Sequence, residues 1–196
     1  TWRLLDPSGQ QVFVQNFGDR DVTTLALAGT YTLLMEGRRF DPNANGNFSF
    51  NIVPQGDVSQ SINVGETVNS SIAFVGQRRT FTFTLPVAAK LYFDALSDIG
   101  FFWSMTGPTG TVVSNRGFQN SDAGEFGSSP LLNLAAGDYT ITFDASGDDT
   151  GAFSFRLLNF AFAQAYTPGT IESNTLTPAK ATRIYRFDAA AGDRFF

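Results

Sequence analysis

The stretch FFWSMTGPTG at positions 101–110 sets the pattern from which the rest of the chain can be read. In it, large apolar residues alternate with smaller ones, and a Gly-Pro-x-Gly turn follows. The stretches 136–143 (AGDYTITF) and 151–157 (GAFSFRL) alternate in the same way. Because successive side chains of a strand point to opposite faces, a period of two predicts strands with one buried face. Region 101–158 is therefore predicted to consist of short β-strands joined by tight turns.

The same alternation predicts strands throughout the chain. They are expected at 2–5, 11–15, 24–28, 31–35, 48–52, 67–74, 80–85, 91–95, 101–105, 131–134, 139–143, 153–157, 170–176 and 184–188. Phe accounts for 21 of the 196 residues, and flat aromatic rings favour pleated, half-buried surfaces. Composition and periodicity therefore agree on an all-β chain.

The pattern recurs at near-constant distances along the chain. The matches are Trp2 with Trp103, Pro7 with Pro108 and Gly9 with Gly110 (a shift of 101); Gly29 with Gly137 and Tyr31 with Tyr139 (108); Gly46, Phe48 and Phe50 with Gly151, Phe153 and Phe155 (105); and Gly65 with Gly169, Phe81 with Tyr185, Phe83 with Phe187 and Tyr92 with Phe196 (104). The shift drifts where insertions fall in loops. We predict tandem antiparallel β-sandwich repeats of about 100 residues. The C-terminal half of a first repeat would occupy 1–55, a complete repeat 56–160 and the N-terminal part of a third 161–196, with polar links at 55–64 and 161–168.

The order of these motifs resembles the bacterial pre-peptidase C-terminal domain. The matching motifs are Arg79-x-Phe81-x-Phe83, Leu91-x-Phe93, Gly107-Pro108-x-Gly110, Leu134-x-Ala136-Gly137-x-Tyr139 and Gly151-x-Phe153-x-Phe155. The resemblance covers the complete repeat and both partial ones. It implies a jelly-roll-like sandwich, used as an accessory module of secreted proteases and as tandem repeats in large surface proteins.

Composition excludes several classes of function. The chain has no Cys and no His, so disulfides, thiolate metal sites and His- or Cys-based catalysis are absent. The net charge is −5, and Lys90 and Lys180 are the only lysines, which argues against a nucleic-acid partner. No apolar run is long enough to span a membrane. We expect the chain, which begins with Thr1, to be part of a longer one.

With His and Cys absent, carboxylates are the remaining candidates for acid–base catalysis and for metal binding. Asp94 with Asp98, and Asp144 with Asp148, are carboxylate pairs that could act as acid and base, but we expect them to be solvated loop residues. The run Asp41-x-Asn43-x-Asn45-Gly46 resembles the start of a calcium loop, although Ile52 occupies the position of the closing Glu. In the corresponding hairpin of the complete repeat, Asp144, Asp148 and Asp149 are the candidate calcium ligands. Turn chemistry alone also explains both clusters.

The aromatic residues allow a ligand surface as well as a core. Trp2 and Trp103 could form a carbohydrate-stacking platform, but their place on an apolar face favours burial in the sandwich. Tyr31 and Tyr139 alternate with core positions. Their hydroxyl groups are therefore expected to bond to backbone at the sandwich edge.

The sequence predicts a non-catalytic protein, secreted to the extracellular cell surface, with a role in spacing, adhesion or assembly into a fibre or layer. Its expected partner is protein, through self-association or neighbouring repeats, because the edges of half a sandwich invite pairing in a head-to-tail manner. The alternative is a glycan- or calcium-binding accessory module of a secreted hydrolase. No other cofactor is expected.

Overall fold

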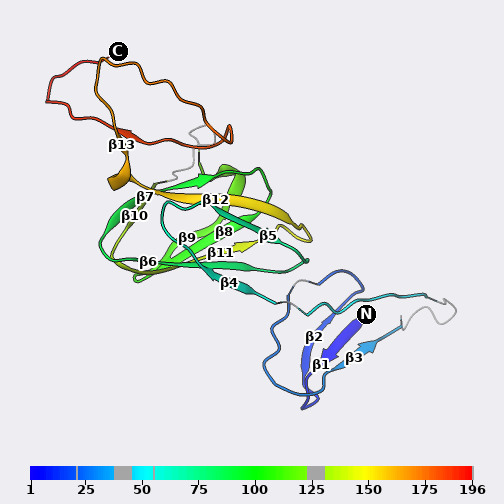
Figure 1. Ribbon diagram of the computed structural model, residues 1–196. Helices are drawn as coiled ribbons and strands as arrows, with labels where there is room; N and C mark the ends of the chain where they lie inside the picture. Colours follow the sequence, from blue (N-terminus) through cyan, green and yellow to red (C-terminus); the bar gives the residue numbers. More distant parts are fainter. Residues whose placement is uncertain (21, 38–45, 55, 123–130, 196) are drawn as a thin grey trace. The chain divides into compact units, whose positions relative to one another are not determined.

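The computed structural model describes residues 1–20, 22–37, 46–54, 56–122 and 131–195, and its regular structure there is almost entirely β (Figure 1). The chain forms two compact units, residues 1–55 and 56–196. Helical structure within the described residues is limited to two short 3₁₀ turns, η1 (Phe118–Asn120) and η3 (Phe160–Phe162). The all-β class predicted from the sequence is confirmed.

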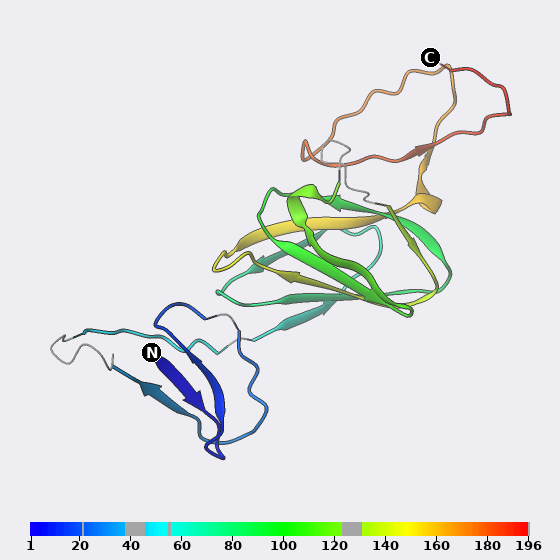
Figure 2. The same cartoon turned by 180° about the vertical axis from the view of Figure 1, so that it is seen from behind.

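The second unit contains an antiparallel β-sandwich, whose two layers are visible in Figures 1 and 2. One sheet has the order β10-β7-β12-β5, and the other has the order β4-β6-β11-β8-β9. Its strands are β4 (Val58–Ser61), β5 (Val68–Ile72), β6 (Arg79–Leu85), β7 (Ala89–Ala95), β8 (Phe102–Gly107), β9 (Gly110–Gly117), β10 (Leu131–Leu134), β11 (Gly137–Asp144) and β12 (Gly151–Asn159). Neighbours are antiparallel except β4 and β6, which are parallel.

The sandwich core is a cluster of aromatic rings contributed by both sheets. Phe93 of β7 lies parallel to Trp103 of β8 at 4.1 Å between ring centroids, and parallel to Phe155 of β12 at 5.4 Å. Phe143 and Phe153 lie 4.7 Å apart in the same cluster. Burial of one such side chain stabilises the fold by about 1.5–3 kcal/mol, and each well-placed ring pair adds about 0.5–1.5 kcal/mol. The Phe side chains thus provide much of the apolar contact that holds the two sheets together.

The first unit contains one sheet of order β2-β1-β3, formed by β1 (Trp2–Leu5), β2 (Gln11–Gln15) and β3 (Thr32–Met35). Its strand order matches that of β9-β8-β11 in the sandwich. The pairs Trp2↔Met35 and Leu4↔Leu33 join β1 to β3. Displaced by 101 and 108 residues, they coincide with Trp103↔Phe143 and Met105↔Ile141, which join β8 to β11. The two sheets therefore share a register as well as an order.

The turns leading into β3 and β11 also match. Gly29 and Gly137 have φ of 143° and 139°, a region that residues with a Cβ rarely adopt. A Cβ at Gly29 would lie 2.7 Å from Cγ of Pro7, and one at Gly137 would lie 2.3 Å from Cγ of Pro108. In both units, the proline ring of the turn between the first two of these strands (β1 and β2, or β8 and β9) therefore contacts the glycine that leads into the third. This contact explains why both residue types recur.

Two tyrosines have the bonding predicted for them. The Tyr31 hydroxyl donates to the carbonyl of Leu27 at 2.8 Å, and the Tyr139 hydroxyl donates to the carbonyl of Ala135 at 2.8 Å. In each case the acceptor precedes the tyrosine by four residues. Each hydroxyl thus ties the strand to the turn before it.

The C-terminal segment, residues 161–195, is mostly extended chain without regular pairing (Figure 2). Its strands are β13 (Gln164–Ala165) and β14 (Tyr185–Arg186), which pair in parallel as Gln164↔Tyr185. The parallel pair Gln60↔Phe81 of β4 and β6 lies 104 residues earlier at both positions. The C-terminal segment thus has the same strand pairing as the start of the sandwich.

Several strand predictions are wrong. Residues 24–28, 48–52 and 170–176 form no strand, while the predicted link 55–64 contains β4, and the link 161–168 begins within η3 and contains β13. Phe153 and Phe155, which correspond to Phe48 and Phe50, pair with β5, and Phe155 also pairs with β7. Phe48 and Phe50 have no such neighbours among the described residues. An alternating pattern becomes a strand only where another strand bonds to it.

Candidate functional site: a buried ion pair beneath the C-terminal segment

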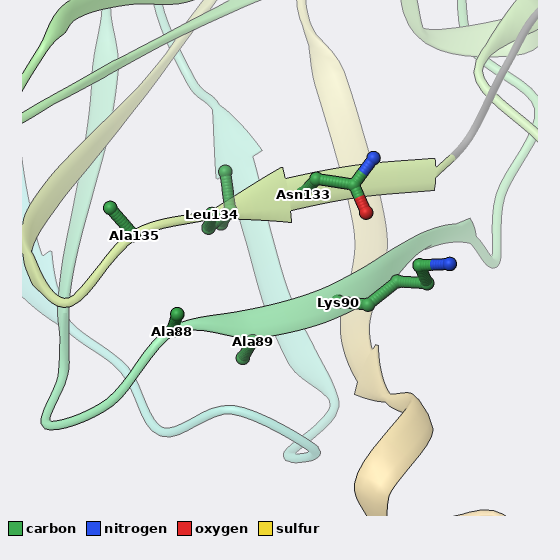
Figure 3. Close-up of a pocket in the computed structure, with 6 residues that line it drawn as sticks. All are labelled: Ala88, Ala89, Lys90, Asn133, Leu134 and Ala135. Atoms are coloured by element: carbon green, nitrogen blue, oxygen red, sulfur yellow. The ribbon is translucent and has the colours of Figure 1, made fainter.

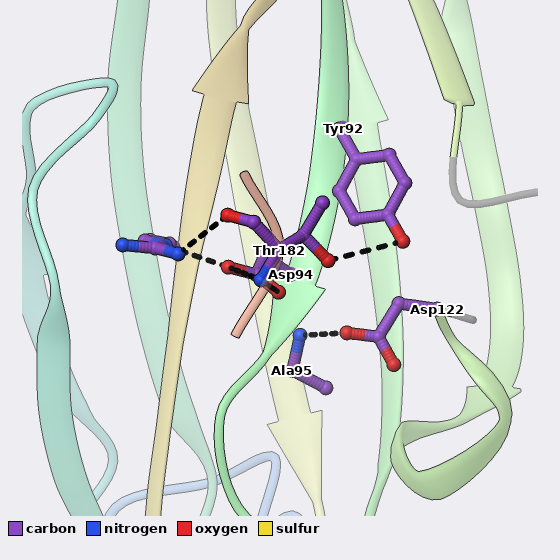
Figure 4. Close-up of polar contacts among 6 residues, drawn as sticks. Tyr92, Asp94, Ala95, Asp122 and Thr182 are labelled. Carbon is purple, nitrogen blue, oxygen red and sulfur yellow. Dashed lines mark hydrogen bonds and ion pairs between the residues drawn. The ribbon is translucent and has the colours of Figure 1, made fainter. Parts of the chain in front are cut away.

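The most elaborate polar arrangement in the described chain lies on the sheet β10-β7-β12-β5, on the face away from the core. Phe93 and Phe155 point into the core, so the alternating positions Asp94 and Arg156 point outward. These two residues face each other in the antiparallel pairing of β7 with β12. Asp94 is nevertheless 0% exposed. Figure 4 shows the segment that carries Thr182 lying against it.

Hydrogen bonds join three residues, Asp94, Arg156 and Thr182, which we call the joint. Arg156 Nε donates to Oδ2 of Asp94 at 2.6 Å, and the same guanidinium donates through Nη2 to the carbonyl of Thr182 at 2.8 Å. The backbone N–H of Thr182 donates to Oδ1 and Oδ2 of Asp94 at 3.1 and 3.3 Å. A charged pair whose bonding capacity is filled in this way tolerates burial. The joint therefore fixes the C-terminal segment to the sheet.

Asp122 lies beside the joint and is almost buried. Its Oδ2 accepts a hydrogen bond from the backbone N–H of Ala95 at 2.6 Å (Figure 4). Burial raises the pKa of Asp122, and the charge of Asp94 raises it further, although the Ala95 N–H and Lys180 oppose the change. Asp122 therefore retains a proton to a higher pH than an exposed aspartate.

The rim of this region carries a second, exposed ion pair. Lys180 Nζ lies 3.3 Å from Oδ2 of Asp98, and their side chains are 47% and 63% exposed. Exposed pairs of this kind contribute about 0–1 kcal/mol. The sequence-based expectation that Asp94 and Asp98 are solvated loop residues is therefore right for Asp98 and wrong for Asp94, which lies in β7 and is covered.

Arg156 and Thr182 were not singled out from the sequence. A signal was present, because Arg156 and Asp94 are single charges at outward positions of strands whose inward residues are apolar. Opposite charges at single outward positions of two core strands can indicate a cross-strand ion pair. Thr182 carries no such signal, because the joint contacts its backbone.

The joint positions backbone and does not present reactive groups. Its carboxylate is neutralised by Arg156 and is closed to solvent, so it has no access to a substrate. The neighbouring hydroxyl groups bond to each other, with Thr182 Oγ1 donating to Tyr92 Oη at 3.4 Å. The arrangement is suited to holding two segments of chain together.

The predicted calcium ligands have a different setting. Asp144 Oδ2 accepts from Arg78 Nε at 2.9 Å in an exposed ion pair. Within the described residues, no three side chains among Asp, Glu, His and Cys lie close enough to hold one metal ion. The structure gives calcium at Asp144, Asp148 and Asp149 no support, and the site stays a prediction. Asp41, Asn43 and Asn45 of the other calcium-like loop lie outside the described residues.

A shallow hollow of about 400 Å³ lies between the edge strand β10 and its neighbour β7 (Figure 3). It is lined by Ala88, Ala89, Lys90, Asn133, Leu134 and Ala135. Lys90 is the one charged residue of the lining, and its Nζ lies 5.9 Å from the ring centroid of Phe160. The lining therefore lacks the paired acid and base that hydrolytic chemistry requires.

The tryptophans occupy the same strand position in different surroundings. Trp103 is buried in the aromatic core, and its Nε1 donates to Ser121 Oγ at 2.6 Å. The carbohydrate-stacking alternative is therefore wrong for Trp103, and the core placement is confirmed. Trp2 is half-buried and lies edge-on to Phe13 at 5.4 Å.

Comparison with known proteins finds likeness only among solved structures. A scan of family models gives no match, and a search of curated proteins also gives none. The pre-peptidase C-terminal domain of a collagenase from Bacillus anthracis is 14% identical, with a TM-score of 0.37, over 55% of this chain and 99% of that domain. PliG of Salmonella Typhimurium, a periplasmic inhibitor of g-type lysozyme, is 15% identical, with a TM-score of 0.39, over 53% of this chain and 99% of that protein. One of these two structures is thus a domain of the family that the sequence motifs resemble.

No helix in the part of the chain that the structure describes is long and apolar enough to cross a membrane.

Proposed function

We propose that the chain is a non-catalytic structural protein of the extracellular surface, in which β-sandwich repeats follow one another in series. The observation that supports this proposal is the agreement in strand register between the parts of the chain. The first unit pairs its strands as β8, β9 and β11 do, and the C-terminal segment pairs its strands as β4 and β6 do. A unit that recurs in this way is typical of proteins whose role depends on the number and spacing of repeats.

The distribution of polar groups supports a passive role. The chain lacks His and Cys, and its most buried carboxylate, Asp94, is neutralised by Arg156. Chemistry by the remaining Asp and Glu residues would need a cleft in which two of them face a substrate. Neither the joint nor the hollow beside Lys90 offers such a cleft.

The joint also suits a chain of repeats. It ties the backbone at Thr182, which by the shift of 104 corresponds to Arg78 just before β6, to the outer face of the preceding sandwich. An ion pair with 0% exposure of one partner resists separation, because opening it would leave a charge without its partner. Consecutive repeats would thereby keep a defined spacing, as adhesion or assembly requires.

Stretching single molecules of the 196-residue chain from its two ends tests this proposal. Because only the sandwich is a complete repeat, we expect one dominant unfolding event that releases about 100 residues, or roughly 300 Å of extended chain. Extension without a resolved force peak would contradict a mechanical role. Hydrolytic activity of the purified chain would contradict a non-catalytic one.

Calcium at Asp144, Asp148 and Asp149 would instead favour an accessory module that binds a ligand. Thermal unfolding with rising calcium concentration distinguishes the two, because a ligand of the folded state raises the melting temperature. Asp148→Asn with Asp149→Asn is the matched control. A calcium-dependent rise that this variant abolishes would support the accessory-module alternative.

A further inference from the structure

Three carboxyl groups and two cations gather where the C-terminal segment lies against the sheet β10-β7-β12-β5. They are Asp94 of β7, Asp98 just after β7, Asp122 just after η1, Arg156 of β12 and Lys180 of the C-terminal segment. Arg156 pairs with Asp94 at 2.6 Å, and Lys180 pairs with Asp98 at 3.3 Å. Each cation is thus engaged by another carboxylate, and Asp122 is the carboxyl group in excess.

Asp122 occupies a place in which its charge is poorly solvated. It is 9% exposed, and its Oδ2 accepts from the N–H of Ala95 at 2.6 Å, one residue after Asp94 (Figure 4). Burial is the first cause of its raised pKa, and the charge of Asp94 and a hydrogen bond between the two carboxyl groups act in the same direction. The Ala95 N–H and the charge of Lys180 oppose the change. Asp122 therefore keeps its proton because of a neighbour that belongs to the joint.

Protonation of Asp122 decides whether the charges of this cluster balance. With Asp122 neutral, two carboxylates stand against two cations, and the sum is zero. Loss of the proton adds a second negative charge beside Asp94, which is 0% exposed. Like charges repel strongly where water cannot screen them. The ionised state is therefore unfavourable as long as the cluster stays covered.

The C-terminal segment is part of that cover. The N–H of Thr182 donates to both carboxylate oxygens of Asp94, and the carbonyl of the same residue accepts from Arg156. Lifting Thr182 from the sheet admits water to Asp94 and so reduces the repulsion from an ionised Asp122. Attachment of the segment and retention of the proton consequently favour each other.

We propose that Asp122 makes the attachment of the C-terminal segment a proton-operated latch, closed while Asp122 is neutral and loosened when it is ionised. The inference goes beyond the proposed function, because it concerns attachment within a single chain. The link between the sandwich and Thr182 is then stiff in acidic surroundings and more mobile in neutral ones.

The direction of the effect follows from proton linkage. With the segment attached, Asp122 binds its proton up to a higher pH than it does with the segment lifted. The attachment is therefore strongest below the ordinary aspartate pKa of 3.8 and weakens as pH rises through the raised value.

Amide hydrogen exchange of the full 196-residue chain tests the latch, read by mass spectrometry on peptides that contain Thr182. Dividing each rate by the intrinsic rate at the same pH leaves the local opening of the segment. In the native chain, protection of Thr182 should fall about three- to tenfold between about pH 4 and pH 8. Asp122→Asn still accepts from Ala95 and cannot ionise, so its protection should stay constant. Asp138→Asn, which removes an exposed carboxylate of the other sheet, is the matched control and should follow the native profile.

A second variant predicts a shift in the opposite sense. Lys180 favours the ionised form of Asp122, so Lys180→Gln should move the midpoint of the loosening to higher pH. Loss of the exposed pair with Asp98 lowers protection at every pH without moving the midpoint, which makes the midpoint the readout.

The latch is overturned if the native chain and Asp122→Asn have the same pH profile of protection. It is also overturned if the midpoint of Lys180→Gln stays at the native pH or lies below it. The second comparison does not involve Asp122→Asn, and it decides the question even if that variant fails to fold.

Discussion

The first unit and the sandwich place equivalent aromatic residues in opposite environments. Phe17, Phe48 and Phe50 are 51%, 58% and 53% exposed, whereas the corresponding Phe118, Phe153 and Phe155 are at most 3% exposed. The ring centroids of Phe17 and Phe48 lie 6.2 Å apart, close to the 6.1 Å between Phe118 and Phe153, although the first pair is stacked and the second is edge-on. These rings therefore lie near each other in both units, and they are buried only in the sandwich, where a second sheet covers them.

The polar groups show the same difference. Trp103 Nε1 donates to Ser121, while the buried Nε1 of Trp2 finds no partner among the described residues. Ser121 corresponds to Arg20 in the first unit. The first unit therefore has the strand order and register of part of the sandwich without its closed set of contacts.

The largest difference in stability is expected when equivalent Phe side chains of the two units are truncated. Phe155→Ala is expected to destabilise the sandwich by about 3–5 kcal/mol, because it removes a fully buried ring in contact with Phe81, Phe93 and Phe143. Phe50→Ala, at the equivalent exposed position, should change stability by less than about 1 kcal/mol. Urea denaturation of the full chain measures both. Equal effects would show that the two positions do not differ in burial.

Disruption of the joint should cause the next largest loss of stability. Asp94→Ala leaves Arg156 unpaired beneath the C-terminal segment, at an expected cost of about 3 kcal/mol. Faster proteolysis within 165–183 should accompany it, because Thr182 loses its acceptor. The control is Asp98→Ala, which removes only the exposed pair with Lys180 and should cost about 1 kcal/mol or less. If the two variants are equally stable, the joint does not hold the segment.

Substitution of Gly137 or Gly29 by alanine tests how much the matching turns contribute to stability in each unit. Gly137→Ala forces a Cβ against Pro108 at a positive φ, and should destabilise the sandwich by about 1–3 kcal/mol. Gly29→Ala has the same local conflict with Pro7, but should leave the unfolding of the sandwich unchanged, because it lies in the other unit. Denaturation curves for both variants, compared with the native chain, test this expectation.

The smallest expected effect concerns pH. The pKa of Asp122 is raised in the folded state, so its contribution to stability is fully present below the ordinary aspartate pKa and is lost as pH rises through the folded value. Asp122→Asn can still accept from the Ala95 N–H and carries no charge. The variant should therefore be modestly more stable than the native chain at pH 7, with the difference vanishing in acid. A difference that stays constant across thermal unfolding at several pH values would refute the role of burial.

Alternation and turn residues were sufficient to predict most strands of the sandwich. Strand β6, where Phe81 and Phe83 alternate with Thr, needs no information beyond its own residues. By contrast, the alternating residues 48–52 form no strand, because a strand also depends on neighbours that a local pattern cannot supply. Strand β4 was missed for the opposite reason: its sequence, VSQS, is polar, and its parallel pairing with β6 alone makes it a strand.

The candidate site was harder to predict than the fold. Asp94 and Arg156 lie 62 residues apart and meet only because β7 and β12 become neighbours. Asp94 was expected to be solvated because a charged residue usually is, and its burial follows from a segment that packs over the sheet. The partner of the ion pair at Thr182 is a peptide group, which every residue carries and which no sequence pattern marks.

Attachment through a peptide group has an evolutionary consequence. Because Asp94 and Arg156 bind the N–H and carbonyl of residue 182, most side chains could stand at that position without loss of the attachment. Apart from the weak bond of Thr182 Oγ1 to Tyr92, residue 182 could then change while the attachment of its backbone to the sheet is inherited unchanged. An attachment of this kind would allow duplicated modules to diverge in surface chemistry without losing their alignment along the chain.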